Sequence, residues 1–489
     1  MAQSCMRQQS NHLPRRDLDA APCARVPCHS AYRTHPVRGK GRSPPDCLIS
    51  LRTFFQPALR TPGTTRKEGT MSSTPQGSPR QLPEHPDLRH LKDQAKDFLR
   101  AGRAASLADA QFQVARQYGF ASWPKLKAHV QSLQTVGQLK QAIDSNDLER
   151  VKQMMTHNPE LHRAPLGYGK NGPLTWVAEC RVPREAPSEA RLAMARWMIE
   201  NGSDVHQGGD GPLMRAALAD MRVPMMELLV AHGADVSALW QGSYPIICAP
   251  CEALAPRALK WLLDHGADPH VAAQDYGSPL QMLVCTYARN AKGRNACLEA
   301  FADAGFDLPD TPTMALYRGR MDLLEAHLVR DPSLLGHRFR EGEIFPAALG
   351  IKPGEGLYAT PVVGGTLLHL AVEYDDIDSA RWLLERGADA DAKAALAADG
   401  FGGHTPLFHA VVTLAAPDDS MARLLLERGA NPNARATIRK QLRDMGDPAK
   451  EMMREFHNVT PIGYARQFQE PGWVNGPAIT AIVERGGTE

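Results

Sequence analysis

Long apolar segments, aromatic residues and an excess of charge of one sign are all scarce in this sequence. No run of about 18 apolar residues occurs, and Met1–Pro14 is almost wholly polar, so neither a membrane span nor a secretory signal is predicted. The 56 basic residues nearly balance the 54 acidic ones, which gives no global field favouring nucleic acid or a membrane surface. These absences predict a cytoplasmic protein with no nucleic-acid or membrane partner.

Aromatic residues are only 6% of the chain, whereas apolar residues make up 43% and are mainly alanine, leucine, valine and methionine. This composition is typical of small packed helices and predicts an all-α body. A length of 489 residues exceeds what one core usually organises, so it predicts several domains or a repeat array.

Cysteine usage is low and irregular, with nine residues at no repeated spacing. In so long a chain they do not form a small disulfide framework, and we expect reduced thiols. Cys248 and Cys251 form a lone C-x-x-C, but zinc would need a second pair or a histidine, and a thioredoxin-like site would need a βαβ context. We therefore predict that both are small core residues; a redox or metal role is the alternative.

The first 81 residues lack any sustained helical or strand period and are rich in proline, arginine, serine and threonine. Such a segment cannot bury enough apolar surface to offset the entropy of ordering, so residues 1–81 are predicted to be a disordered tail. We also hypothesise that translation starts at Met71, which would make residues 1–70 an upstream extension. The alternatives are a genuine basic tail or an organelle-targeting segment, and the intact mass of the native protein distinguishes them.

The rest of the sequence contains a repeated phrase: an apolar helix ending in Leu-Leu, two polar residues, and then Gly-Ala-Asp or a close variant. It occurs at 226–236, 260–270, 381–390 and 423–434, with a weaker copy at 196–206. Gly202, Gly233 and Gly266 are 31 and 33 residues apart. Glycine at this place ends a helix because it adopts left-handed backbone angles without a steric penalty.

A second phrase, the start motif, opens each unit and reads T-P-L-H-x-A or a variant. It occurs at 172–178, 211–217, 244–250, 278–284, 366–372, 405–411 and 460–466. Thr405 or Ser278 can cap a helix, and a proline in the first turn sacrifices no hydrogen bond. Less regular units at 138–162 and 313–337 give two helices without the glycine ending.

These two phrases, recurring in order, resemble the ankyrin-repeat family over about residues 138–487. The resemblance implies an all-α solenoid of about nine helix-turn-helix units joined by β-turn fingers. Repeats are expected at 134–337 and 365–489, separated by an insertion at 338–364. A second insertion at 434–458 carries charges and a possible short helix. Leu367 departs from the family, which usually has proline there.

Residues 82–133 are expected to form a separate short three-helix module, because Leu88, Leu91 and Phe98 share one helical face. The segment 106–130 resembles a helical module that often precedes ankyrin repeats in bacterial proteins. Phe120 and Trp123 are expected in the core of this module, with a binding patch as the alternative.

Sequence signatures of catalysis are missing: no P-loop, H-E-x-x-H, EF-hand, dinucleotide fingerprint or G-x-S-x-G occurs. His369 fills the TPLH position of the family, so the resemblance implies that it supports the loop backbone through hydrogen bonds. His409, one position later, is expected to pack between helices. No catalytic, cofactor-binding or metal-binding residue is predicted.

The candidate partner-binding residues are the aromatic residues of the predicted fingers, Tyr168, Trp240, Tyr276 and Phe401. Exposed aromatic side chains on a rigid surface often anchor protein interfaces. The alternative is that each ring packs back on its own finger. The sequence thus predicts a monomeric, non-catalytic scaffold that binds an unidentified protein. Two alternatives are a hydrolase or metal-dependent enzyme with a site on the insertions, and a secreted effector that binds a host protein.

Overall fold

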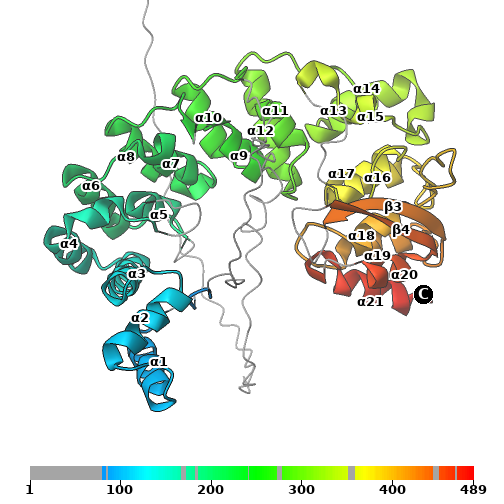
Figure 1. Cartoon of the computed structure of the whole chain (residues 1–489). Helices are drawn as coiled ribbons and strands as arrows, with labels where there is room; N and C mark the ends of the chain where they lie inside the picture. Colours follow the sequence, from blue (N-terminus) through cyan, green and yellow to red (C-terminus); the bar gives the residue numbers. More distant parts are fainter. Residues whose placement is uncertain are drawn as a thin grey trace, which may run out of the picture. The chain divides into compact units, whose positions relative to one another are not determined.

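A computed structural model describes residues 80–83, 86–166, 172–181, 185–240, 242–271, 278–350, 358–443, 451–468 and 471–489 (Figure 1). The predicted tail, except for its last two residues, lies outside the described residues, and so do Tyr168 and Tyr276. Within the described ranges the chain is rich in helices and has few strands. None of the helices described is both long and apolar enough to cross a membrane.

Three helices open the described chain: α1 (Leu88–Arg100), α2 (Leu107–Gln117) and α3 (Trp123–Asp144). Each begins after a capping side chain, namely Asp87, Ser106 and Ser122, which accept hydrogen bonds from backbone N–H groups of the first turn. The three helices share one apolar cluster, against which Phe120 and Trp123 pack as partly buried rings. Helix α3 runs on through residue 133, and its last turns belong to a second, larger cluster.

Beyond α3 the chain is a succession of short antiparallel helix pairs. The single helix α4 spans Leu148–His157 and is followed by α5 (Pro173–Glu179) with α6 (Glu189–Glu200), α7 (Gln207–Ala216) with α8 (Val223–Ala231), α9 (Cys248–Ala253) with α10 (Pro256–Asp264), α11 (Pro279–Val284) with α12 (Ala291–Asp303), and α13 (Pro312–Tyr317) with α14 (Met321–Arg330). After the short α15 (Glu341–Ile344) come α16 (Leu367–Glu373) with α17 (Ile377–Glu385), α18 (Pro406–Val411) with α19 (Ser420–Glu427), α20 (Pro461–Gln467) and α21 (Gly476–Glu484). Short 3-10 helices lie at Pro159–Arg163, Asp220–Arg222, Pro332–Leu335, Ala347–Leu349 and Pro471–Trp473.

The start motifs form the first helix of each pair, and the glycine phrases end the second. Helices α5, α11, α18 and α20 each begin with the proline of their motif, and α13 in a less regular unit also begins with a proline, Pro312. Gly233 and Gly387 follow α8 and α17 with φ of +98° and +92°, which favours a residue without a Cβ atom. First helices contact one another across units, as α5 does α7 and α16 does α18, and so build one continuous apolar core from Leu139 to Ile482.

The second insertion is a β-hairpin, so the short helix expected within 434–458 is wrong. Strand β3 (Ala436–Arg443) pairs antiparallel with β4 (Glu451–Val459), with Ile438 opposite Phe456. These two side chains are buried, whereas Glu455 and His457 on the other face are exposed. This alternation of period two is what a strand with one buried face requires. The other strands in the described ranges are β1 (Leu239–Trp240) and β2 (Tyr244–Pro245), a small two-stranded finger.

Candidate functional site

A side-chain contact recurs between successive first helices. We number each start motif from the residue before its first-turn proline, which in the α16 motif is Thr366 because Leu367 replaces the proline. In the less regular unit that precedes α4 we number from Gly137. In this numbering, the acidic side chain at position 8 of one unit contacts the side chain at position 5 of the next unit. The three pairs are Asp144 with Trp176, Glu179 with Arg215, and Glu373 with His409.

The three contacts differ in chemistry and burial. The indole N–H of Trp176 donates a 2.7 Å hydrogen bond to Asp144. Glu179 and Arg215 lie 3.8 Å apart, and each side chain is 15% exposed. The Glu373 pair is fully buried. The same two positions therefore carry a polar link between units, with the donor changing from one junction to the next.

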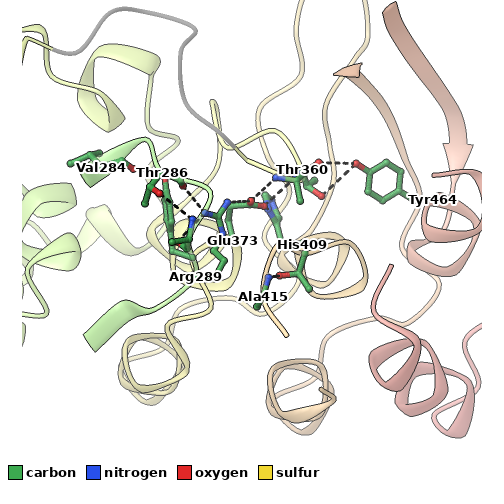
Figure 2. Close-up of polar contacts among 12 residues, drawn as sticks. Val284, Thr286, Arg289, Thr360, Glu373, His409, Ala415 and Tyr464 are labelled. Carbon is green, nitrogen blue, oxygen red and sulfur yellow. Dashed lines mark hydrogen bonds and ion pairs between the residues drawn. The ribbon is translucent and has the colours of Figure 1, made fainter. Parts of the chain in front are cut away.

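Glu373 is the most heavily hydrogen-bonded of these acids (Figure 2). One carboxylate oxygen lies 2.9 Å from Nη2 of Arg289 and accepts a 2.7 Å bond from the backbone N–H of Ala359. The other lies 2.7 Å from Nδ1 of His409 and accepts a 3.2 Å bond from the N–H of Thr360. Burial alone would raise the pKa of Glu373, but the hydrogen bond from His409 and the charge of Arg289 outweigh it and lower the pKa. The side chain is therefore an ionised carboxylate in the core.

Arg289 carries this network from the α11–α12 connection to α16. Its Nη1 donates to the carbonyl of Thr286 at 2.8 Å, and its guanidinium lies 4.9 Å from the ring centre of Tyr374. The hydroxyl of Tyr374 in turn donates to the carbonyl of Val284 at 3.2 Å. The guanidinium of Arg294 approaches the same ring at 4.6 Å. These contacts join units that lie on either side of the first insertion.

Three buried histidines lie beside Glu373. His369 Nδ1 accepts a 3.0 Å bond from the N–H of Thr366, and its Nε2 donates to the carbonyl of His404 at 3.1 Å. The predicted support of the loop backbone by His369 is thereby confirmed. His404 Nε2 donates to the carbonyl of Pro361 at 2.8 Å. Burial lowers the pKa of His369 well below its ordinary value and lowers that of His404 to about 3, so both rings are neutral.

The predicted finger aromatics are not brought together in the described ranges. Trp240 is buried, with 7% of its surface exposed, so the expectation of an exposed ring is wrong at this position. Its ring packs edge-on against Tyr244 at 6.1 Å and lies over Gly208 and Gly211. A Cβ atom at Gly211 would come within 3.3 Å of the indole nitrogen. Phe401 is half-buried on a different finger, with its ring 3.8 Å from the guanidinium of Arg439.

Cys248 and Cys251 lie on α9 and are fully buried in the core, as predicted. Burial raises the pKa of both thiols, which disfavours the reactive thiolate. No group of three or more histidine, cysteine or acidic residues in the described ranges is arranged to hold a metal ion. Two separate histidine–acid pairs lie at the described parts of the insertions. His337, directly before the first insertion, pairs with Glu343, and His457 in the second insertion pairs with Glu455, each at 3.2 Å.

Glu373, Arg289 and Asp144 were not among the residues predicted from the sequence. A signal for the acids was present, because the eighth position of a start motif holds Glu179 and Glu373 in two different units. No comparable signal marks Arg289, which pairs with a residue 84 positions away and stands outside either repeated phrase.

Comparison with known proteins bears on part of the chain. No curated protein matches this sequence. Residues 349–436, which include α16 to α19, match the family model described as ankyrin repeats (3 copies), so this part of the chain consists of ankyrin repeats.

Proposed function

We propose that the chain is a non-catalytic, monomeric ankyrin-repeat scaffold that binds another protein in the cytoplasm. In this proposal the repeats extend from about residue 138 to residue 487, preceded by the helical module at 82–133. Binding uses the surface formed by the fingers and the first helices. Ankyrin repeats generally mediate protein–protein interaction, which supports this assignment for the matched segment.

The observation that carries the proposal is the recurrent link between eighth and fifth positions. It occurs at Glu373 and His409, inside the matched segment, and equally at Asp144 and Trp176, far outside it. Units that repeat a side-chain contact in the same register stack in the same way. A rigid stack of this kind holds successive fingers in fixed positions, which is what a preorganised binding surface needs.

Phe401 is the described finger aromatic best placed for contact with a partner. Its ring is half-buried between Arg439 and His457, whose ring centre lies 5.7 Å away. Arginine and aromatic residues are enriched among the side chains that contribute most to interfaces. We therefore assign the partner-binding role to Phe401 and Arg439. The buried Trp240 has a supporting role, because its ring packs within its own finger.

The test is affinity capture from a lysate of the native cells with the full chain as bait, followed by mass spectrometry. Recovery of a specific protein that falls several-fold with Phe401→Ala supports the proposal. The control is Val329→Ala on the second helix α14, whose side chain is 74% exposed and should not affect capture. Failure to retain any protein above background would contradict a scaffold role, and equal recovery with Phe401→Ala would remove this finger from the binding surface.

A further inference from the structure

A groove of about 600 Å³ lies among the starts of three second helices, α12, α14 and α17. Its lining includes Lys292, Met321 and Ile377 from the first turns of these helices, Asp375 from the turn before α17, and Trp382 further along α17. The fingers precede the first helices, whereas this groove follows them, so the two surfaces lie at opposite ends of the antiparallel helix pairs. The volume lies in the range of pockets that bind ligands.

Three ion pairs lie in or beside the groove: Arg289 with Glu373 at 2.9 Å, Lys292 with Asp378 at 3.6 Å, and Arg294 with Asp376 at 3.7 Å. Asp375 belongs to none of them. Within the described part of the chain, its half-buried carboxylate makes neither a hydrogen bond nor an ion pair. The groove therefore contains one acid whose charge has no direct partner.

The local structure does not require a carboxylate at Asp375. Acids are common at the start of a helix, and here Asp376 caps α17 by accepting a 3.1 Å bond from the N–H of Ser379, while Asp378 lies in the first turn. Asp375 precedes the cap and has a left-handed backbone with φ of +55°. Asn146, at the same position 10 of an earlier unit, has φ of +56°. The turn therefore needs a residue that tolerates left-handed angles, which asparagine also does.

The surroundings of Asp375 disfavour its ionised form. Burial, followed by the charge of Asp418, raises the pKa of Asp375 from 3.8 to about 6, against the opposite effect of Arg289; the charge of Asp376 raises it as well. Asp418 lies on the connection between α18 and α19 and accepts a 2.8 Å bond from the N–H of Ser420. A cation in the groove would stabilise the ionised carboxylate of Asp375, because an opposite charge nearby lowers the pKa of an acid.

We propose that this groove binds a lysine or arginine side chain of a partner protein, with the positively charged group paired to Asp375. Long basic side chains carry an apolar stem behind the charge, and the stem packs against the apolar part of the lining, Met321 and Ile377. The inference rests on the proposed protein-binding function. It adds a second contact surface, at the end of the helix pairs opposite the fingers, and names the chemistry of the partner there.

The test compares two selections from one displayed library of random ten-residue peptides, with the full wild-type chain and the full Asp375→Asn chain as targets at pH 7.5. Peptides that contain lysine or arginine should be enriched on the wild type and lost on the variant. Synthetic copies of them should bind Asp375→Asn about tenfold more weakly, because a charge-assisted hydrogen bond is lost. Asn146 shows that asparagine fits the backbone of this turn, so the variant should fold normally.

Two further variants frame this result. The matched control is Asp303→Asn, which removes one negative charge at an exposed site at the far end of α12 and should leave the affinity unchanged. Lys292→Gln should act in the opposite direction and raise the affinity several-fold, because it removes a competing cation and frees Asp378. The side chain of Lys292 is 87% exposed, so this change should not disturb folding.

The pH dependence of binding identifies the carboxylate. At pH 5 only about a tenth of a carboxyl group with a pKa near 6 is ionised, so wild-type affinity should fall about tenfold between pH 7.5 and pH 5. The weaker binding by Asp375→Asn should not change over this range. The other acids in the groove, Asp376 and Asp378, are paired with Arg294 and Lys292.

Hydrogen exchange locates the bound peptide, which should slow exchange in the segments 289–292, 319–321 and 375–379. Three results would overturn the inference: no basic peptide that depends on Asp375, protection confined to other segments, or a concentration-dependent dimer that Asp375→Asn abolishes, since the last would assign the groove to a second copy of the chain. The scaffold proposal would survive any of these results if a native partner were still captured in a Phe401-dependent way.

Discussion

The carboxylate of Glu373 lies 2.9 Å from the guanidinium of Arg289, and neither side chain is exposed to solvent. Removing one member of a buried ion pair leaves an uncompensated charge in the core and typically costs about 3–5 kcal/mol. We therefore expect both Arg289→Met and Glu373→Gln to lower the urea midpoint of unfolding strongly. The first leaves the carboxylate without its countercharge, and the second leaves the guanidinium without its own and turns an amide NH2 group toward hydrogen-bond donors.

The control for this pair is Arg386→Ala. Arg386 pairs with Glu325 on the surface, where the two side chains are 36% and 46% exposed. Exposed pairs contribute about 0–1 kcal/mol, so this change should scarcely move the midpoint. Equal losses in Arg289→Met and Arg386→Ala would show that the buried network does not stabilise the junction between units.

The buried histidines predict a pH dependence of stability. In the folded chain the pKa of His404 is lowered from 6.5 to about 3, and that of His369 is lowered in the same direction, both through burial. Between about pH 6.5 and pH 3 the unfolded chain therefore binds more protons than the folded chain, so stability rises with pH in this window. The contribution is complete above pH 6.5 and is lost progressively as the pH falls.

Thermal unfolding at pH 7.5, 6.0 and 5.0 measures this effect. The pKa of Glu373 is also lowered from 4.5. The stability that its carboxylate contributes is therefore lost only as the pH falls below about that value, which is below most of the pH range in which the histidines act. His404→Gln should flatten the decline between pH 6.5 and pH 5. An unchanged pH profile in that variant would show that His404 is not the titrating group.

The link between Asp144 and Trp176 predicts an energetic coupling between two units outside the matched segment. Trp176→Phe removes the indole N–H that donates to Asp144 at 2.7 Å while keeping most of the buried ring. A double-mutant cycle with Asp144→Asn should give a coupling of roughly 0.5–1.5 kcal/mol, because a partly exposed hydrogen bond is removed. Trp261→Phe on the second helix α10 provides a control that should not couple to Asp144. A coupling near zero for Trp176 would mean that this link contributes nothing to stacking.

Much of the helical architecture could be read from the sequence, because its signals are local. The first-turn prolines and the left-handed glycines each fix backbone geometry within a few residues, and the structure places them at helix starts and ends. The supporting role of His369 also follows from its position within a single motif, although its acceptor, the carbonyl of His404, lies 35 residues away.

The features that were wrongly predicted from the sequence depend on contacts between residues far apart in the chain. Trp240 packs over Gly211, about thirty residues earlier, where a Cβ atom would come within 3.3 Å of its indole nitrogen. The second insertion is a hairpin because Ile438 and Phe456 pair across the turn and because Gly402 of another finger bonds to β3. Its charged composition carries no clear strand period, so a local interpretation favoured a helix.

The lone C-x-x-C gives a prediction that separates a core role from a redox role. Cys248 and Cys251 are fully buried, and burial raises the pKa of both thiols. Because the thiolate is the reactive form, both should alkylate slowly with iodoacetamide at pH 8 in the native chain and rapidly in urea. Peptide mass spectrometry of samples quenched at several times measures the two rates. The buried Cys297, whose pKa is also raised, is the internal reference and should label as slowly in the native chain. In a redox pair, one of the two thiols would instead react much faster than Cys297 while the chain remains folded. That result would indicate a functional site at the C-x-x-C.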